Sequence, residues 1–197
     1  MKRWKKWLPA AGILMGLVCL VWLFVGRNYY AADTRVEEGV TFQLRADRLR
    51  AFAEKCPWDG TSETLTYRVP DRVGGAKVTA LGGLIYGSAF KKLPYGWGVE
   101  MPQTFRGAQR NHFPAPEGTR EVTLTVYLQL GRYVSSMESM GIPEAVYYCG
   151  GGTGESYVVR QRWVVSCDAE NRTYYARDGR LYYRQGDIPV EFCYESE

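Results

Sequence analysis

The hydrophobic and polar positions divide this chain into one long apolar run and a series of short segments in which the two kinds alternate. The apolar run covers residues 8–25, eighteen positions without a charged side chain. The later segments are rich in Val, Thr, Tyr and Leu, and Pro or Gly residues separate them, which is typical of β-strands. We therefore predict a β-rich domain with strands within residues 63–69, 77–81, 121–130, 156–166 and 180–185.

The apolar run is long enough to cross a membrane as a helix. Eighteen residues at about 1.5 Å per residue span about 27 Å, close to the thickness of the hydrocarbon core of a bilayer. Lys2, Arg3, Lys5 and Lys6 precede the run, and such positive residues favour the cytoplasmic side. The apolar region of a cleavable signal peptide, the alternative, is shorter, at roughly 7–15 residues. A retained signal anchor is therefore favoured over a cleaved signal.

This interpretation predicts the domain layout and the location of the protein. We expect a single-pass protein of the cell membrane, with a cytoplasmic N-terminus and an extracytoplasmic C-terminal part large enough for one domain with its own core. The layout is a cytoplasmic basic tail at 1–7, a transmembrane helix at 8–25, a linker at 26–40 and the extracytoplasmic domain at 41–197.

Two parts of the predicted domain lack a clear strand pattern. Residues 42–56 carry apolar side chains at helical spacing, but they fit equally well as two short strands around Ala46 and Asp47. Residues 84–118 are rich in Gly, Pro and aromatic residues without a regular pattern. We predict an irregular insertion there, ordered by its aromatic side chains.

The charge distribution argues against a nucleic-acid partner. The first 26 residues hold four of the 25 basic residues and none of the 21 acidic ones, which leaves 21 of each in the rest of the chain. Nucleic-acid binding relies on clustered cations that neutralise phosphates. The sequence shows no such cluster, so we predict no nucleic-acid partner.

The cysteines indicate disulfides or buried thiols rather than a metal site. Four of the five cysteines follow the apolar run, where an extracytoplasmic location permits disulfides. No Cys-x-x-Cys motif occurs, and the one histidine, His112, is far from any cysteine in the sequence. Of the three possible pairings, we predict Cys149 with Cys167, because 18 residues separate them and Tyr-rich strands flank both.

No arrangement of residues indicates catalysis or a cofactor. A single histidine without a nearby Ser or Cys motif disfavours a hydrolase of the Ser-His or Cys-His type. The run of glycines at 150–154 lacks the Lys and Ser/Thr of a phosphate-binding loop, so we interpret it as a turn or loop. Neighbouring acidic residues at 37–38 and 168–170 are expected to be solvated loop charges. We predict no catalytic, cofactor-binding or metal-binding residues.

Three segments share an order of residue types: a strand, a break at Gly or Asp, and a second short strand. They lie at residues 67–83, 122–141 and 163–185. Recurring units suggest a solenoid, in which each unit buries the apolar face of its neighbour. In the last unit an Asp-Gly dipeptide predicts a tight chain reversal between aromatic strands.

These units resemble the BspA-type leucine-rich repeats of bacterial surface proteins. In that family a strand ending in Val-Pro is followed by a glycine turn, a Val-Thr-x-Ile-Gly segment and Ala-Phe. The matching residues of the first unit are Val69, Pro70, Gly75, Val78, Thr79, Leu81, Gly82, Ala89 and Phe90. A second family motif is matched by Asn171, Tyr174, Asp178, Gly179, Leu181 and Tyr182. The resemblance implies a β-rich, leucine-rich-repeat-like solenoid whose short strands are joined by loops or short helices.

We expect from these features a membrane-anchored domain that binds a protein or glycan ligand outside a bacterial cell and has no enzymatic activity. Tyr95 and Trp97 are candidates for exposed aromatic side chains that contact the ligand. Two alternatives remain open at this stage. One is a structural or assembly subunit of an envelope complex, and the other is a cell-wall-acting enzyme whose carboxylate pair the sequence does not show.

Overall fold

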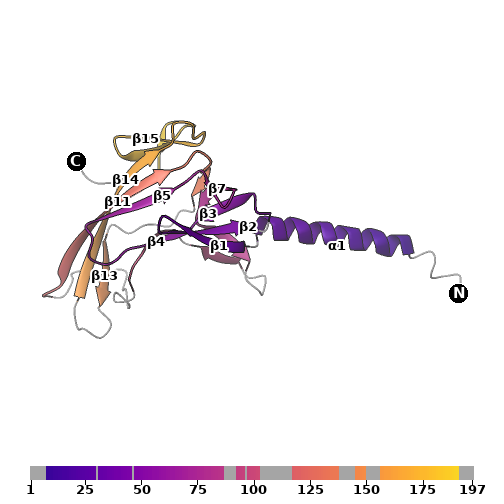
Figure 1. Cartoon of the computed structure of the whole chain (residues 1–197), viewed down its shortest axis with the longest axis horizontal. Coiled ribbons are helices and arrows are strands. Elements are labelled where there is room, and N and C mark those ends of the chain that lie inside the picture. The colour runs from indigo at the N-terminus through magenta and orange to yellow at the C-terminus, as the bar shows by residue number, and fades with distance from the viewer. Residues whose placement is uncertain are drawn as a thin grey trace.

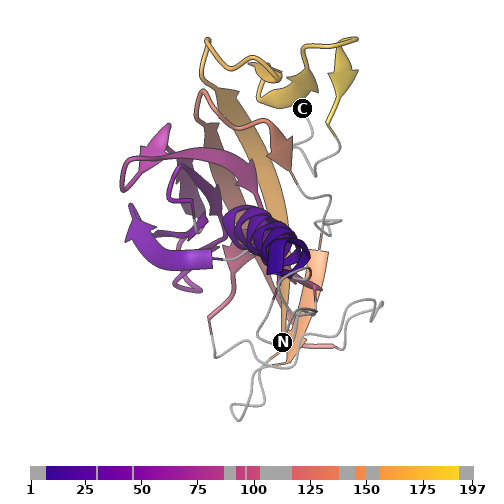
Figure 2. The ribbon, with the colours of Figure 1, turned by 90° about the vertical axis from the view of Figure 1, so that its right-hand side faces the viewer.

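The computed structural model describes most of the chain as one helix and a set of short β-sheets (Figure 1). The described residues are 8–29, 31–45, 47–86, 92–95, 97–102, 117–137, 145–149 and 156–190. Helix α1 (Leu8–Tyr29) extends away from the strands, which form the rest of the described structure (Figure 1). The view along α1 in Figure 2 shows the sheets arranged around and behind its end.

The membrane-anchor prediction for residues 8–25 is contradicted. In the part of the chain that the structure describes, no helix is both long enough and apolar enough to cross a membrane. The prediction of a single-pass location in the cell membrane, which depended on this span, is wrong with it.

The first sheet joins the N-terminal strands to the middle of the chain. Its strand order is β1-β2-β3-β7-β12, with β6 paired to β7. Strands β1 to β3 are antiparallel, whereas β3, β7 and β12 are parallel. The bounds are β1 (Ala31–Glu37), β2 (Val40–Arg45), β3 (Arg50–Ala53), β6 (Arg72–Val73), β7 (Ala76–Leu81) and β12 (Ser136–Met137). The segment expected to be a linker at 26–40 therefore contains a paired strand.

Residues 42–56 form strands, as the second of the two interpretations expected. Alternate residues of β2 are buried, which is the period of a strand with one face on a core. Asp47 lies in the turn before β3, and its Oδ1 accepts hydrogen bonds from the N–H groups of Leu49 and Arg50 at 3.0 and 3.3 Å. These bonds satisfy backbone groups where the chain reverses. The apolar residues whose spacing resembled a helix therefore lie in separate strands on either side of this turn.

The second sheet contains the three parallel strands on which the candidate site depends. Its order is β13-β14-β11-β5, with β5, β11 and β14 parallel and β13 antiparallel to β14. In the register of this sheet, Val69 pairs with Leu130 and Leu130 pairs with Cys167, so the three parallel strands end together. The bounds are β5 (Thr64–Val69), β11 (Arg120–Leu130), β13 (Ala145–Cys149) and β14 (Ser156–Cys167).

Smaller sheets complete the described structure. Strand β4 (Lys55–Pro57) pairs with β10 (Gly98–Glu100) in parallel, and β8 (Gly83–Tyr86) pairs with β9 (Lys92–Tyr95) in an antiparallel hairpin. These three strands β8 to β10 fall within the segment predicted to be an irregular insertion, of which residues 103–116 lie outside the described residues. Near the C-terminus, β15 (Tyr174–Arg177), β16 (Arg180–Tyr183) and β17 (Ile188–Pro189) form an antiparallel sheet.

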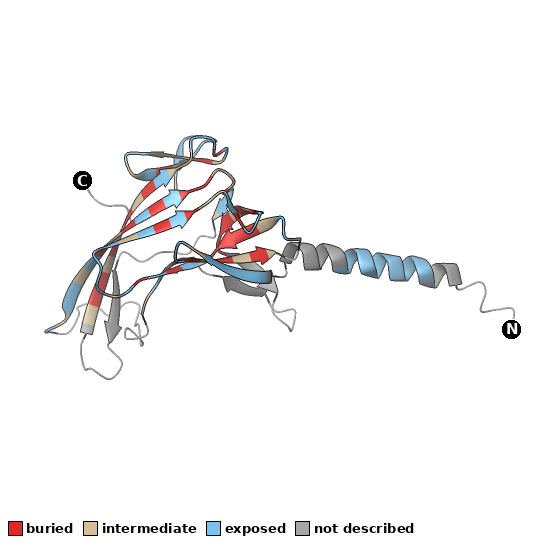
Figure 3. Cartoon of the chain, in the orientation of Figure 1, coloured by how far each residue is buried: buried red, intermediate tan, exposed pale blue. Residues whose placement is uncertain are grey.

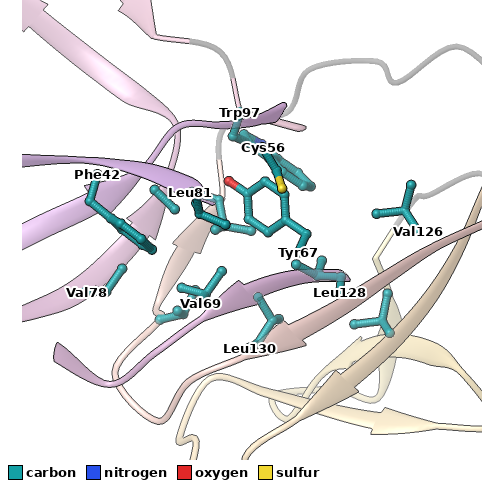
Figure 4. Close-up of a cluster of buried hydrophobic side chains, with 14 of the residues drawn as sticks. Phe42, Cys56, Tyr67, Val69, Val78, Leu81, Trp97, Val126, Leu128 and Leu130 are labelled. Atoms are coloured by element: carbon teal, nitrogen blue, oxygen red, sulfur yellow. The ribbon is translucent and has the colours of Figure 1, made fainter. Parts of the chain in front are cut away.

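The core lies between the first and second sheets. Phe42, Val78 and Leu81 of the first sheet are buried, and so are the inward residues of β5 and β11, which alternate with exposed ones (Figure 3). Tyr67 of β5 is fully buried beside Cys56, Leu81 and Trp97 (Figure 4). Trp97 is edge-on both to Tyr67, with 6.3 Å between ring centroids, and to Trp163, at 5.7 Å. Side chains from four sheets thus share one hydrophobic cluster.

The predicted solenoid is wrong. A solenoid stacks equivalent units along one axis, whereas this chain forms several small sheets that mix parallel and antiparallel neighbours and do not close into one coil. The segment around the Asp-Gly turn does not repeat the Val-Pro unit of β5, because it forms the separate antiparallel sheet of β15 to β17.

The turn between β15 and β16 has a different role, which is to cover the edge of β14. Asp178 and Gly179 adopt positive φ values of 52° and 70°, as the sequence predicted for a tight turn. The Val165 N–H donates a hydrogen bond of 2.7 Å to the carbonyl oxygen of Gly179. Strand β13 pairs with β14 only as far as Arg160, so the turn satisfies part of the edge that β13 leaves open.

The predicted disulfide between Cys149 and Cys167 does not form. Cys149 pairs with Ser156 at the start of β14, whereas Cys167 is the last residue of that strand. The length of β14 places their backbones about 36 Å apart at about 3.3 Å per residue, far beyond the reach of a disulfide. Cys167 is a free thiol, and its Sγ donates to the carbonyl oxygen of Tyr174 at 3.6 Å.

Candidate functional site

The three parallel strands of the second sheet end at one edge, where three chain turns lie side by side. We call these turns, residues 70–75, 131–135 and 168–173, the corner stack. The turns are in close contact: a Cβ atom built on Gly131 would lie 2.7 Å from the Val69 carbonyl oxygen and 2.9 Å from that of Pro70. On the other side, the Asp168 N–H donates to the Leu130 carbonyl oxygen at 2.9 Å. The strand register therefore determines which residues meet at this edge.

Asn171 holds the second and third turns together. Its side chain is buried, at 1% exposure, and its Nδ2 donates to the carbonyl oxygens of Gly131 and Val134 at 2.8 and 3.0 Å. Its Oδ1 accepts from the N–H groups of Thr173 and Tyr174 at 2.9 and 2.8 Å. These four bonds satisfy four backbone groups that no strand ladder serves, so one amide fixes the geometry of the corner stack.

Arg132 links all three turns through charge. Its backbone N–H donates to Asp71 Oδ1 at 2.7 Å, and its Nε lies 3.4 Å from Asp71 Oδ2. Its guanidinium also forms an ion pair with Glu170, with 2.8 Å between Nη1 and Oε2. The two carboxylates hold Arg132 across the corner stack and neutralise part of the positive charge there.

A cleft of about 600 Å³ opens at the corner stack. A volume of this size is typical of sites that hold a small ligand or a short segment of a larger one. We call it the corner cleft. Its lining residues are Lys77, Arg132, Tyr133, Val134, Ser135, Glu170, Arg172 and Thr173.

The ring of Tyr133 carries an unusual concentration of cations. Lys77 Nζ lies 4.5 Å from the ring centroid, and the guanidinium carbons of Arg72 and Arg132 each lie 5.7 Å from it. Each pair is within the range of a cation–π interaction. The ring therefore holds the cations in place, and the cations cover ring surface that a flat ligand would need for stacking.

The corner cleft has an excess of positive charge. Three of its lining residues are cations, Lys77, Arg132 and Arg172, whereas Glu170 is its one acidic residue. Arg132 is engaged by carboxylates, but within the described residues neither Lys77 nor Arg172 has a carboxylate partner. The site can therefore attract and hold an anionic group.

The outer face of the same strands provides a second surface with a different character. Tyr127 of β11 is 44% exposed and lies between Thr66 of β5 and Val164 of β14. No cation of the described residues lies over its ring. Since described residues line the corner cleft and bring three cations together there, we regard it as the better candidate site.

The structure brings together few of the residues that the sequence singled out for binding. Trp97 is only 5% exposed and packs in the core, so the prediction that it is exposed is wrong. Tyr95 lies in β9, and its side chain is outside the described part of the chain. Of the motif residues, Pro70, Gly75 and Asn171 belong to the corner stack, whereas Val69, Val78, Leu81, Tyr174 and Leu181 are core residues.

Glu38 and Asp168, each from one of the neighbouring acidic pairs in the sequence, have other partners in the structure. Glu38 forms an ion pair with Arg68 at 3.0 Å, and Asp168 accepts a hydrogen bond from its own loop, at the Glu170 N–H. Burial raises the pKa of Glu54, and neighbouring Glu100 adds to this effect while Gln43 opposes it. Within the described residues, no three potential metal ligands lie close enough together to hold an ion.

The comparisons with known proteins give no family for this chain. Neither the protein-family models, nor the curated proteins, nor the solved structures contain a match.

The sequence did not reveal the corner cleft. Its cations come from positions 77 to 172, far apart in the sequence, so the charge count that predicted no cationic cluster could not detect them. One partial indication was present: the three motif segments each contain a break after a strand, and these breaks became the turns of the corner stack. The register that aligns the breaks is a property of the folded sheet.

Proposed function

We propose that this protein is a non-catalytic binding protein that holds an anionic ligand in the corner cleft. The observation that carries the proposal is that Lys77, Arg132 and Arg172 line one cleft together with Tyr133. Long cationic side chains lose rotamer freedom when they are ordered, and their mutual repulsion opposes their proximity. A bound anion offsets both costs.

The environment of the cleft supports holding a ligand over transforming it. Asp71 and Glu170, the carboxylates nearest to the cleft, are both engaged by Arg132. A general base needs a carboxylate that is available to accept a proton. Here the carboxylates serve to orient a cation, which suits recognition by charge and shape.

The test is a binding titration of the full chain against soluble polyanions and a neutral control. We propose hexaglutamate peptide, oligogalacturonate and a heparin fragment as anionic probes, with dextran as the neutral probe. Binding of at least one anionic probe, weakened by added salt and by the double variant Lys77→Ala/Arg172→Ala, is expected. Arg120→Ala, at the opposite end of β11, is the matched control for loss of charge.

Failure of all three anionic probes to bind would overturn the proposal. The same would follow if the double variant bound them as tightly as the unmodified chain does. A stoichiometric protein partner that co-purifies with both the unmodified chain and the double variant would support the alternative of an assembly subunit.

A further inference from the structure

We infer that Glu170 is a displaceable occupant of the corner cleft, whose carboxylate holds the place on Arg132 that an anionic group of the ligand takes, an inference that rests on the proposed function. Glu170 is the one acidic residue among those that line the cleft. Its Oε2 lies 2.8 Å from Nη1 of Arg132, the distance of a charge-assisted hydrogen bond. A carboxylate of the chain itself thus occupies the guanidinium where the ligand binds.

Arg132 has a second set of contacts that does not depend on Glu170. Its backbone N–H donates to Asp71 Oδ1 at 2.7 Å, and its Nε lies 3.4 Å from Asp71 Oδ2. Its guanidinium carbon lies 5.7 Å from the centroid of the Tyr133 ring, within the range of a cation–π interaction. Arg132 therefore keeps its position when another anion replaces the Glu170 carboxylate on Nη1.

The Glu170 carboxylate is held more weakly than that of Asp71. The side chain of Glu170 is 68% exposed, against 35% for that of Asp71. An ion pair in an exposed position contributes little, because water and salt screen it and the ordering of two long side chains costs entropy. A ligand anion can therefore displace Glu170 at low cost, while Asp71 stays in place.

The backbone around Glu170 is fixed, so the displacement is a movement of its side chain alone. The Glu170 N–H donates to Asp168 Oδ1 at 2.8 Å, and the Asn171 N–H donates to the Asp168 carbonyl oxygen at 3.0 Å. The Ala169 carbonyl oxygen accepts from Nη2 of Arg184 at 3.1 Å. The Glu170 side chain rotates toward solvent, and the turns of the corner stack keep their geometry.

This arrangement makes Glu170 a specificity-determining residue. A neutral group cannot replace the ion pair that Glu170 forms with Arg132, so it leaves the carboxylate in place. An anionic group exchanges one negative charge for another on the guanidinium, which binds carboxylate and phosphate oxygens alike. The cleft therefore accepts anionic groups and rejects neutral ones of similar shape.

The experiment separates occupancy of Arg132 from simple charge repulsion by Glu170. Glu170→Gln removes the negative charge, whereas Glu170→Asp keeps the charge on a side chain one methylene shorter, which no longer reaches Nη1. Labelled hexaglutamate, oligogalacturonate and heparin fragment are titrated with the full chain and followed by fluorescence anisotropy. Both variants are expected to bind about threefold more tightly those probes that bind the unmodified chain.

Glu121 provides the matched control, because it forms an ion pair with Arg160 near the other end of the same strands. The stretch of β11 from Glu121 to Leu130 covers about 30 Å at about 3.3 Å per residue, well beyond the screening length of about 10 Å at 0.1 M salt. Glu121→Gln and Glu121→Asp should therefore bind each probe within about 1.5-fold of the unmodified chain.

A double variant tests whether Glu170 acts through Arg132. Arg132→Gln removes the guanidinium and leaves Lys77 and Arg172 to bind the probes more weakly. In this background Glu170→Asp should change the affinity by less than about 1.5-fold. A threefold effect that persists without the guanidinium would overturn the inference.

The remaining outcomes separate this inference from the proposed function. Tighter binding by Glu170→Gln with unchanged binding by Glu170→Asp would indicate repulsion without occupancy, which overturns the inference and leaves the proposed function standing. Weaker binding by either variant would do the same, because Glu170 would then support the bound ligand. Absence of binding of every anionic probe would overturn both.

Discussion

The end and the outer face of the same three parallel strands have opposite properties. At the end of the strands, Tyr133 is covered by cations, and buried hydrogen bonds from Asn171 fix the surrounding turns. On the outer face, Tyr127 has no cation over its ring and lies between small neighbours on a regular ladder. The ladder satisfies every strand residue in the same way, whereas the ends leave backbone groups that need specific side chains.

This difference shows where the fold can hold specific chemistry. A ladder position tolerates many side chains, because its backbone bonds do not depend on them. A turn in the corner stack depends on particular residues. The side-chain amide of Asn171 satisfies its backbone groups, and the missing side chain of Gly131 lets two turns come close together. Substitutions at the strand ends should therefore cost more than substitutions on the face.

The largest effect is expected for Asn171→Ala. The change removes the four hydrogen bonds of the Asn171 side chain, and of the four backbone groups that lose one, the Gly131 carbonyl oxygen keeps a bond of 3.4 Å from the Val134 N–H. We expect a loss of about 4 kcal/mol in the free energy of unfolding, measured by urea denaturation. Thr123→Ala, on the exposed face of β11, is the control and should change it by less than about 0.5 kcal/mol. Similar losses of unfolding free energy for Asn171→Ala and Thr123→Ala would contradict the difference between the strand ends and the outer face.

The next effect concerns the close approach at Gly131. A Cβ at this position would lie 2.7 Å from a backbone oxygen, so Gly131→Ala must push two turns apart. We expect the free energy of unfolding, measured by urea denaturation, to fall by about 3 kcal/mol and the binding of anionic probes to weaken. Gly75→Ala separates crowding from backbone conformation, because Gly75 has a φ of +84° but nothing within 4 Å of its Cβ position. Gly75→Ala should lower the free energy of unfolding by about 1 kcal/mol. If it lowered that free energy as much as Gly131→Ala does, or more, crowding would not explain the effect at Gly131.

The pH dependence of stability tests how deeply two thiols are buried, Cys56 beside the middle of β5 and Cys167 at the end of β14. Burial raises the pKa of Cys56, which contacts the Thr66 carbonyl of β5, from 9.0 to about 11. Burial also raises the pKa of Cys167, at the end of β14, to about 11, with Asp168 adding to the rise and Arg184 opposing it.

Because the folded thiols keep their protons up to about pH 11 and unfolded thiols lose them above about pH 9, stability should be intact below pH 9 and fall as the pH rises to 11. We expect Cys56 to account for a loss of unfolding free energy on the order of 2 kcal/mol, and Cys56→Ala should remove this contribution from the pH dependence. The measurement is a series of urea denaturations between pH 8 and pH 11. A flat series would show that the thiols are less buried than the structure indicates.

The smallest effect is expected for Tyr127→Ala. This side chain is already half in solvent and holds no turn, so the unfolding free energy should change by less than about 0.5 kcal/mol. The affinity for hexaglutamate should also stay within about twofold. A loss of ligand binding in this variant, measured by fluorescence anisotropy, would move the candidate site from the strand ends to the outer face.

The sequence predicted the strands well and their arrangement poorly. Alternation placed β5, β7, β11 and β14 within one residue of their observed bounds, because burial of one strand face is a local property. The Asp-Gly turn was also predictable, since positive φ depends on the two residues themselves. Which strands pair, and in which direction, depends on distant partners, and the expected solenoid was wrong for that reason.

The candidate site could not be predicted from the sequence, for the same physical reason. Lys77, Arg132 and Arg172 become neighbours only because three strands end in register. Trp97 illustrates the opposite error: an aromatic residue in a Gly-rich segment seemed suited to an exposed position, yet it fills the space between Tyr67 and Trp163. Burial of a large side chain in such a segment depends on the cavity that other strands leave.

The hydrogen bond between Val165 and Gly179 has a consequence for how copies of this chain behave toward each other. Residues 161–167 include Trp163 and two valines, a sequence with a strong tendency to add strands from another molecule. The turn of the β15–β16 hairpin occupies that edge within the chain itself. A cut before this hairpin should therefore leave this part of the β14 edge open to pairing with a strand of another copy.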